Sequence, residues 1–407
     1  METISDKDGG RTLVLASIGH FVNDGSTFFV PVIAALLALQ PGVQATDVGG
    51  MLVVFYASSV VASVYLGRMA DRTGRPGPMI GIGLALLSFG LIGFALSLAL
   101  ATGSALVLFS AVSALVAGIG SAFFHPLSAT ILRSSHPDGS RGKVLGIAGA
   151  VGSVGRMLYP ALFTVFAVAL TQEGSIALFG LIGLILSSVV WLGLRRTRLP
   201  PTPKDSSSKG KLNRGLAALS VVALVRGMAE VGIVAWVPTF IGVTKGAGVT
   251  DTGIAVTIMY SAGIIGQPLF GILSDRFQER LILSITSFGA AIFILAFVYA
   301  TGLWVLAFLF AFGLFSLNSY VLMLSAAGDY AKVGSGSTEN ALVWGIGTTV
   351  GAALGPSLVG LIILNDYTRL SIALPVMAAI SIVAGVLALL LPRPSMRRGG
   401  RAKVPRS

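Results

Sequence analysis

The sequence predicts an all-α membrane protein with twelve transmembrane helices arranged as two similar six-helix bundles. Of its 407 residues, 54% are hydrophobic and only 11% are charged, whereas soluble domains carry about 25% charged residues. Apolar stretches of the length that crosses a bilayer, about 20 residues, recur along the chain. The twelve stretches are 13–40, 46–67, 78–101, 104–132, 143–170, 174–194, 215–243, 252–274, 281–301, 303–327, 337–363 and 370–391.

The basic residues orient these spans. If the N-terminus is cytoplasmic, 24 of the 28 Lys and Arg residues fall on the cytoplasmic side. The outer connections then hold only Lys245 and Arg369, and Arg156 and Arg226 lie inside spans. Cytoplasmic connections of membrane proteins are enriched in Lys and Arg, so we expect a multi-pass protein of the cell membrane with both termini in the cytoplasm. This asymmetry accounts for the net charge of +12 without a nucleic-acid partner.

The predicted organisation has five parts. A cytoplasmic N-terminus at 1–12 precedes a first bundle at 13–194, and a cytoplasmic linker at 195–214 is rich in Pro, Ser and Lys, as solvated linkers are. A second bundle at 215–391 and a basic cytoplasmic tail at 392–407 complete the chain. Cysteine is absent, which excludes disulfides and thiolate metal sites. No metal or cofactor is expected.

The two bundles repeat each other weakly. The run Gly67-Arg68-Met69-Ala70-Asp71-Arg72 is similar to Gly271-Ile272-Leu273-Ser274-Asp275-Arg276. Two further pairs of positions correspond between the halves at nearly the same offset in residue number. His20 and Asp24 correspond to Arg226 and Glu230, and Gly146-Ile147 corresponds to Gly345-Ile346. Similar spacing in three separate helices indicates duplication of a six-helix unit, and many transporters are built in this way, with a site between the halves.

Short motifs carry a family resemblance. The cytoplasmic run Gly67-x-x-x-Asp71-Arg72-x-Gly74-Arg75 resembles the loop signature of the major facilitator superfamily. His20-Phe21-Val22-Asn23-Asp24, and Gly118 to Pro126 with the sequence GIGSAFFHP, resemble the fosmidomycin-resistance efflux family. The resemblance implies the major facilitator fold, with helices 1, 4, 7 and 10 around a central cavity, and proton-driven export of drugs. Arg156 departs from that family's pattern.

Ionisable residues inside the spans are candidates for function because a charge in the bilayer is costly. His20 and Asp24 share one face of a helix, and so do Arg226 and Glu230. Burial favours the neutral form of a carboxyl group and a nearby guanidinium favours its charged form, so Asp24 and Glu230, with His20, are the predicted proton-coupling residues. The alternatives are a structural salt bridge between Arg226 and Glu230, and structural hydrogen bonds for His20 and Asp24.

Substrate contacts are predicted from the same helices. Arg156 can bind a carboxylate or phosphonate through two hydrogen bonds, or form a permanent ion pair with Asp24. His125 either binds substrate or satisfies a carbonyl freed by Pro126. The predicted substrate-binding residues are Arg156, Arg226, His125, Asn23 and Tyr320. The glycines at 146, 149, 152 and 155 predict close helix packing.

The repeated loop supplies a predicted gate. A carboxylate there can contact a helix N-terminus and an arginine and hold the cytoplasmic side shut, as the resemblance implies; the alternative is surface charge that only sets topology. The gating residues are Asp71, Arg72, Arg75, Asp275 and Arg276.

The predicted function is that of a secondary active transporter, not an enzyme. The chain lacks the metal-ligand or Ser/His patterns of an intramembrane protease. We expect an antiporter that exports a drug-like or anionic compound in exchange for protons, with a proton-coupled importer of a small organic anion as the alternative. The expected partners are this small-molecule substrate, protons and the lipid bilayer, and we expect a monomer.

Overall fold

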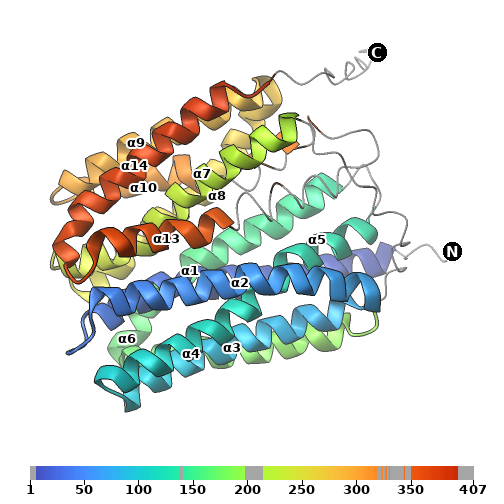
Figure 1. The fold of residues 1–407 in the computed structure, drawn as a ribbon. Helices are drawn as coiled ribbons and strands as arrows, with labels where there is room; N and C mark the ends of the chain where they lie inside the picture. Colours follow the sequence, from blue (N-terminus) through green and yellow to red (C-terminus); the bar gives the residue numbers. More distant parts are fainter. Residues whose placement is uncertain are drawn as a thin grey trace.

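The structure, a computed structural model, describes residues 6–136, 141–197, 214–318 and 350–392, with isolated positions between 322 and 343. Its regular elements in these ranges are helices that run side by side (Figure 1). Within these ranges, nine helical segments are long and apolar enough to cross a membrane, and one of them, Val144–Leu194, covers two predicted spans. Two shorter apolar helices, Trp304–Ser316 and Val350–Ile363, fall within the predicted spans 303–327 and 337–363. The pattern of twelve predicted spans is therefore confirmed wherever the structure describes it.

The first half of the chain forms six helical elements. They are α1 (Asp6–Ala38), α2 (Ala45–Thr73), α3 (Pro76–Leu100), α4 (Gly103–Ser121), α5 (Phe124–Ser134) and α6 (Arg141–Leu194). The helix α3 contacts α4 and α6, and α6 also contacts α1. These contacts close the first bundle around the middle of α1, so the polar side chains there are packed inside protein.

Two of the predicted spans are interrupted. The predicted span 104–132 divides into α4 and α5, because the helix pauses at Ala122 and Phe123 before Pro126 in the first turn of α5. Proline is tolerated in a first turn, where its missing N–H costs no helical hydrogen bond. In α6 the break predicted between spans 143–170 and 174–194 falls at Thr171, whose φ of 70° and ψ of 169° are not helical.

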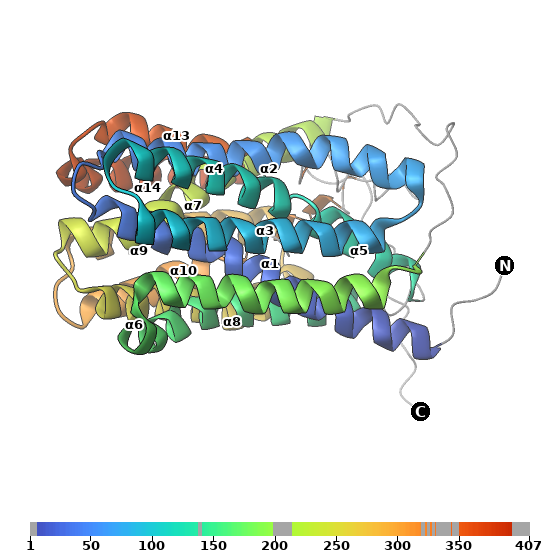
Figure 2. The same cartoon turned by 90° about the horizontal axis from the view of Figure 1, so that it is seen from below.

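The second half repeats this arrangement. It contains α7 (Arg214–Thr239), a π-helical turn (Phe240–Thr244), α8 (Val249–Arg276), α9 (Glu279–Tyr299), α10 (Trp304–Ser316), α13 (Val350–Ile363), a 3₁₀ turn (Tyr367–Arg369) and α14 (Leu370–Leu389). The helix α7 packs on α13 and α14, and α9 packs on α10 and α14. Figures 1 and 2 show α1 beginning at the same end of the bundle at which α6 ends and α7 begins.

The halves meet along α1 with α7, α2 with α13, and α6 with α8. At the end where α2 begins, Thr46 donates a hydrogen bond of 2.7 Å to Asn365, and the backbones of Gly49 and Gly360 lie against each other. Nearer the middle, the Tyr260 hydroxyl donates to the carbonyl of Phe28 at 3.0 Å. These contacts close the side of the molecule opposite to the start of α1.

Large apolar side chains are exposed over the outside of the bundle, among them Leu100, Val168, Tyr299, Leu303 and Leu361. Soluble proteins rarely expose large apolar surfaces. Lipid is the environment in which this surface is stable, as the composition predicts.

Candidate functional site

Asp24, near the middle of α1, is the centre of an ion cluster in the first bundle. Its carboxylate oxygens lie 3.4 Å from His20 Nε2, 3.4 Å from His125 Nε2 and 3.3 Å from Arg156 Nε. Only 3% of Asp24 is exposed. A buried carboxylate is tolerated where cationic or hydrogen-bonding groups compensate it, and α1, α5 and α6 each supply one such group.

Asn23 and His125 complete one side of the cluster. Asn23 Nδ2 donates to Asp24 Oδ1 at 3.1 Å and lies 3.4 Å from His125 Nε2. The break between α4 and α5 places His125 in the first turn of α5, where its side chain can reach α1. The side chain of His125 is 33% exposed, compared with 5% for that of Asp24. The cluster is therefore more open on the His125 side than elsewhere.

Arg156 is the group that connects the cluster to the second half of the chain. Its Nη2 donates to Ser153 Oγ at 2.8 Å, and its guanidinium lies 4.9 Å from the centre of the Phe28 ring. Ser153 Oγ also accepts a hydrogen bond of 3.1 Å from Gln267 on α8. Arg156 and a hydrogen bond between the halves therefore share one acceptor, Ser153.

Glycines allow α6 to approach α1 at this point. A methyl group at Gly152 would lie 2.5 Å from the His20 ring, and one at Gly155 would overlap the carbonyl of Phe21. Methyl groups at Gly146 and Gly149 would meet open space. The predicted packing role is confirmed for Gly152 and Gly155 and is wrong for Gly146 and Gly149, which lie one to two turns before this contact.

Arg226 lies apart from this cluster, in the interior of the second bundle. Its guanidinium donates to Thr286 Oγ1 at 3.0 Å, to Ser287 Oγ at 2.7 Å and to Asn318 Oδ1 at 2.9 Å. Further acceptors are backbone carbonyls of α9 and the end of α10. Arg226 is 3% exposed. This placement favours a structural role over substrate binding.

Glu230, one turn after Arg226, lines a small internal cavity together with Arg226, Ser316 and Ser381. The charged contacts of Asp24 come from α1, α5 and α6, whereas Glu230 belongs to α7. The two carboxylates that the sequence pairs as proton-coupling groups therefore have different partners: Asp24 lies in the ion cluster, and Glu230 lies beside Arg226. The proton-coupling role of Glu230 stays a prediction.

The remaining predicted residues fall largely outside the described part of the chain. Tyr320 and the side chains of Asp71, Arg72 and Asp275 are not described. Arg75 precedes α3 and Arg276 ends α8, and both are exposed. The gate predicted at these positions stays a prediction.

The ion cluster also has the composition of a metal site. His20, Asp24 and His125 offer ligand atoms that lie within 4.8 Å of one another. Arg156 is already 3.3 Å from the same carboxylate, and its positive charge opposes a second cation there. The donor set therefore fits an anion or a proton better than a metal ion.

Sequence reasoning missed Ser153 and Gln267. Gln267 could have been identified from the sequence, because it is an uncharged polar residue in the apolar span 252–274. Ser153 carries no such signal, because serine is common in transmembrane helices. Only the approach of α8 to α6 gives Ser153 its second donor, Gln267.

Comparison with known proteins identifies the family. The family model described as Major Facilitator Superfamily matches residues 16–342 and 219–406. A probable L-galactonate transporter of Escherichia coli (strain K12) is 22% identical over 267 residues, which are 58% of this chain. The match spans about half of that relative, 54% of its length.

Solved transporters share the fold. A bacterial homologue of the human lysosomal transporter Spinster, in an inward-facing and unoccupied conformation, superposes with a TM-score of 0.73 at 16% identity, over 95% of this chain and 97% of its own. A D-xylose-proton symporter gives a TM-score of 0.73 at 13% identity, over 94% of this chain and 98% of its own. A nucleoside transporter gives a TM-score of 0.71 at 14% identity, over 93% of this chain and 98% of its own.

These likenesses support the superfamily, while the narrower resemblance to the fosmidomycin-resistance family stays a prediction. The relatives described above are transporters. The apolar helices place the chain in a membrane. The chain therefore belongs to the Major Facilitator Superfamily, and it is a multi-pass membrane protein.

Proposed function

We propose that this protein carries a small organic anion across the cell membrane together with a proton, by alternating access, with Asp24 as the proton-binding residue and Arg156 as the anion-binding residue. The observation that carries the proposal is the ion pair between these two residues, at 3.3 Å. The pair lies beside a hydrogen bond that joins the two halves of the chain.

The chemistry of the pair couples the two ligands. While Asp24 is ionised, its carboxylate neutralises Arg156, and a substrate carboxylate would have to compete for the same guanidinium. When Asp24 takes up a proton, Arg156 loses its internal counter-charge and can bind a substrate anion through two hydrogen bonds. Proton and anion then bind together, which is the requirement for symport.

His20 and His125 supply a route for the proton. Both imidazoles lie 3.4 Å from the carboxylate, and an imidazole nitrogen can accept or donate a proton. His125 is the more exposed of the two side chains, at 33%. We assign it the transfer of protons between water and Asp24.

Motion of the halves follows from the same contacts. Arg156 shares Ser153 with Gln267 of the second half, so a substrate that draws the guanidinium away changes the hydrogen bonding of Ser153 at the contact between the halves. The contact between Thr46 and Asn365, which is closed here, would open in the opposite conformation of the transport cycle. With both termini in the cytoplasm, as the distribution of Lys and Arg favours, the described arrangement is closed to the outside.

The related L-galactonate transporter supports the substrate class, because galactonate is a sugar acid. The exporter predicted from sequence motifs is the second candidate. It is favoured by the gathering of His20, Asn23, Asp24 and His125 from the two motifs into one cluster. In an exchanger the substrate and the proton would bind in alternation instead of together.

Proteoliposomes distinguish the two candidates. Purified protein is reconstituted with a pH-sensitive dye inside the vesicles, and a panel of sugar acids, beginning with galactonate, is added outside. Symport acidifies the lumen as the anion enters, and exchange makes the lumen more alkaline. Uptake that leaves the internal pH unchanged would contradict proton coupling in either form.

A further inference from the structure

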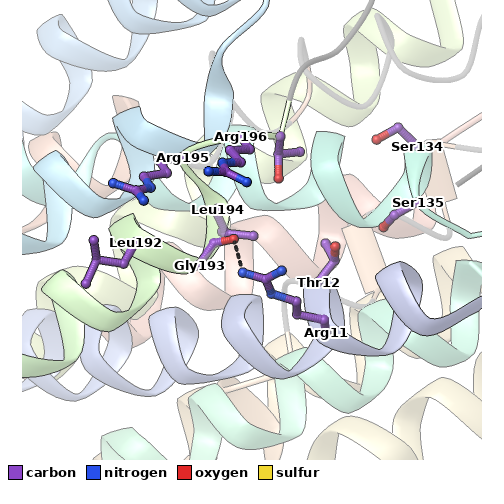
Figure 3. Close-up of a pocket in the computed structure, with 10 residues that line it drawn as sticks. Arg11, Thr12, Ser134, Ser135, Leu192, Gly193, Leu194, Arg195 and Arg196 are labelled. Atoms are coloured by element: carbon purple, nitrogen blue, oxygen red, sulfur yellow. Dashed lines mark hydrogen bonds between the residues drawn. The ribbon is translucent and has the colours of Figure 1, made fainter. Parts of the chain in front are cut away.

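A second polar site lies at the end of the first bundle at which α1 begins. A cavity of about 640 Å³ opens there between the start of α1, the end of α5 and the end of α6. Figure 3 shows its lining. We call it the basic cavity, and it is formed by Arg11, Thr12, Ser134, Ser135, Leu192 to Leu194, Arg195, Arg196 and Thr197.

The charges of the basic cavity are unbalanced. Arg11, Arg195 and Arg196 all line it, and the lining residues that the structure describes include no aspartate or glutamate. None of the three arginines forms an ion pair with a carboxylate in the part of the chain that the structure describes. Three like charges around one cavity repel one another, and a bound anion would relieve this repulsion.

Helix capping accounts for only part of this arrangement. Arg11 Nη2 donates to the carbonyl of Gly193 at 3.1 Å, in the last turn of α6 (Figure 3), which is a favourable place for a cation. Arg195 lies over the ring of Trp191, with 5.9 Å between its guanidinium carbon and the ring centre. A guanidinium carries five N–H donors, so donors of all three arginines remain for a ligand.

The depth of the cavity in the membrane indicates the source of the anion. The apolar segments Gly9–Ala38 and Val144–Leu194 meet the cavity at their ends, so it lies where hydrocarbon gives way to water. Leu192, which lines it, is 53% exposed, and Trp191 beside it is 38% exposed. Tryptophan is enriched at this level of the bilayer. A ligand here meets guanidinium groups on one side and lipid-facing apolar surface on the other.

We propose that the basic cavity binds the phosphate group of an anionic phospholipid. Arginine binds phosphate oxygens through paired hydrogen bonds, and the hydroxyl of Thr197 can donate a further bond, whereas the hydroxyls of Ser134 and Ser135 already donate to the carbonyl of Ile131. Leu192 and Trp191 would contact the first methylenes of the acyl chains. This site is separate from the ion cluster around Asp24, and the proposal does not depend on the direction or the substrate of transport.

The test compares two double variants that each remove two exposed arginines. R195Q/R196Q changes the cavity, and R214Q/R276Q removes the same charge elsewhere. Purified protein is titrated with phosphatidylglycerol, phosphatidylcholine or inorganic phosphate, and bound ligand is counted by native mass spectrometry. Phosphatidylglycerol should bind the unaltered protein and R214Q/R276Q with equal affinity, and R195Q/R196Q roughly tenfold or more weakly.

The other outcomes would overturn the proposal. Equal loss in both double variants would mean a general attraction between basic protein and anionic lipid. Equal binding of phosphatidylcholine would mean that the headgroup charge is not recognised. Binding of inorganic phosphate as tight as that of phosphatidylglycerol would mean a site for the free ion. Thermal unfolding of each variant without lipid separates loss of binding from loss of folding.

Discussion

Gln267 of α8 donates a hydrogen bond of 3.1 Å to Ser153 of α6, whose hydroxyl also accepts a bond of 2.8 Å from Arg156. One serine thus connects the second half of the chain to the ion pair of Arg156 and Asp24. The hydroxyl donates its own proton to the carbonyl of Gly149 at 3.2 Å, so its bonding capacity is filled. Any motion that separates α6 from α8 has to break a bond next to the charged pair.

Replacing Asp24 with Asn tests proton coupling. The amide keeps the shape of the carboxyl group but cannot take up or release a proton at physiological pH. We expect Asp24→Asn to express normally and to lose accumulation of substrate against its gradient by at least about tenfold, equivalent to ~1.4 kcal/mol. Uptake into proteoliposomes with and without a pH gradient measures this loss. Asp366→Asn, at an exposed turn, is the control, and persistent accumulation by Asp24→Asn would show that the proton binds elsewhere.

Replacing Arg156 with Ala tests anion binding. A hydrogen bond to a charged group contributes about 1.5–3 kcal/mol, so the affinity for anionic substrates should fall roughly 10- to 100-fold. Neutral analogues of the same substrates should lose much less. Competition against a labelled substrate measures both. If neutral and anionic compounds lose affinity equally, Arg156 is a structural partner of Asp24 only.

Arg226 should behave differently from Arg156. Its removal leaves Thr286, Ser287 and Asn318 without their buried donor, and an unsatisfied buried group costs about 1–3 kcal/mol. We expect Arg226→Met to lower the midpoint of thermal unfolding clearly, while the protein that remains folded keeps its preference among substrates. Arg280→Gln, near the surface, is the matched control. A changed substrate preference with unchanged stability would place Arg226 in the substrate site.

Replacing two glycines of α6 with alanine should change the unfolding free energy in opposite directions. A methyl group at Gly155 would overlap the carbonyl of Phe21, whereas one at Gly149 meets open space. Gly155→Ala should cost about 1–3 kcal/mol of unfolding free energy through overpacking. Gly149→Ala should be neutral or stabilising by up to ~1 kcal/mol, because alanine is the better helix former. Thermal unfolding of the two variants measures the two effects. Equal changes in stability would contradict the described contact of α6 with α1.

The contact between Thr46 and Asn365 can be locked covalently. Their side-chain oxygens lie 2.7 Å apart across the two halves, and the chain contains no cysteine of its own, so T46C/N365C introduces the only pair of thiols. Oxidation should stop exchange of substrate across the membrane, and reduction should restore it. Each single cysteine variant should remain active under oxidation. Full activity of the cross-linked protein would mean that this contact need not open during transport.

Sequence alone determined the membrane setting, the pattern of spans and the identity of the costly charges. These features are local, because each span must be about 20 apolar residues long, and each buried charge is visible as an exception within a span. The motif His20 to Asp24 and the residue His125 were found in this way, and so was Arg156.

Tertiary structure decided which of these charges meet. The sequence treats Asp24 and Glu230 as equivalent positions of two repeats, but Arg156 and His125 reach Asp24, while Arg226 beside Glu230 turns toward α9 and α10. The approach of α6 to α1 at Gly155, and the placement of Gln267 against Ser153, depend on how the helices pack. Helical spacing fixes the face on which a residue lies, but the partner of that face is set by the packing of distant segments, which no local pattern records.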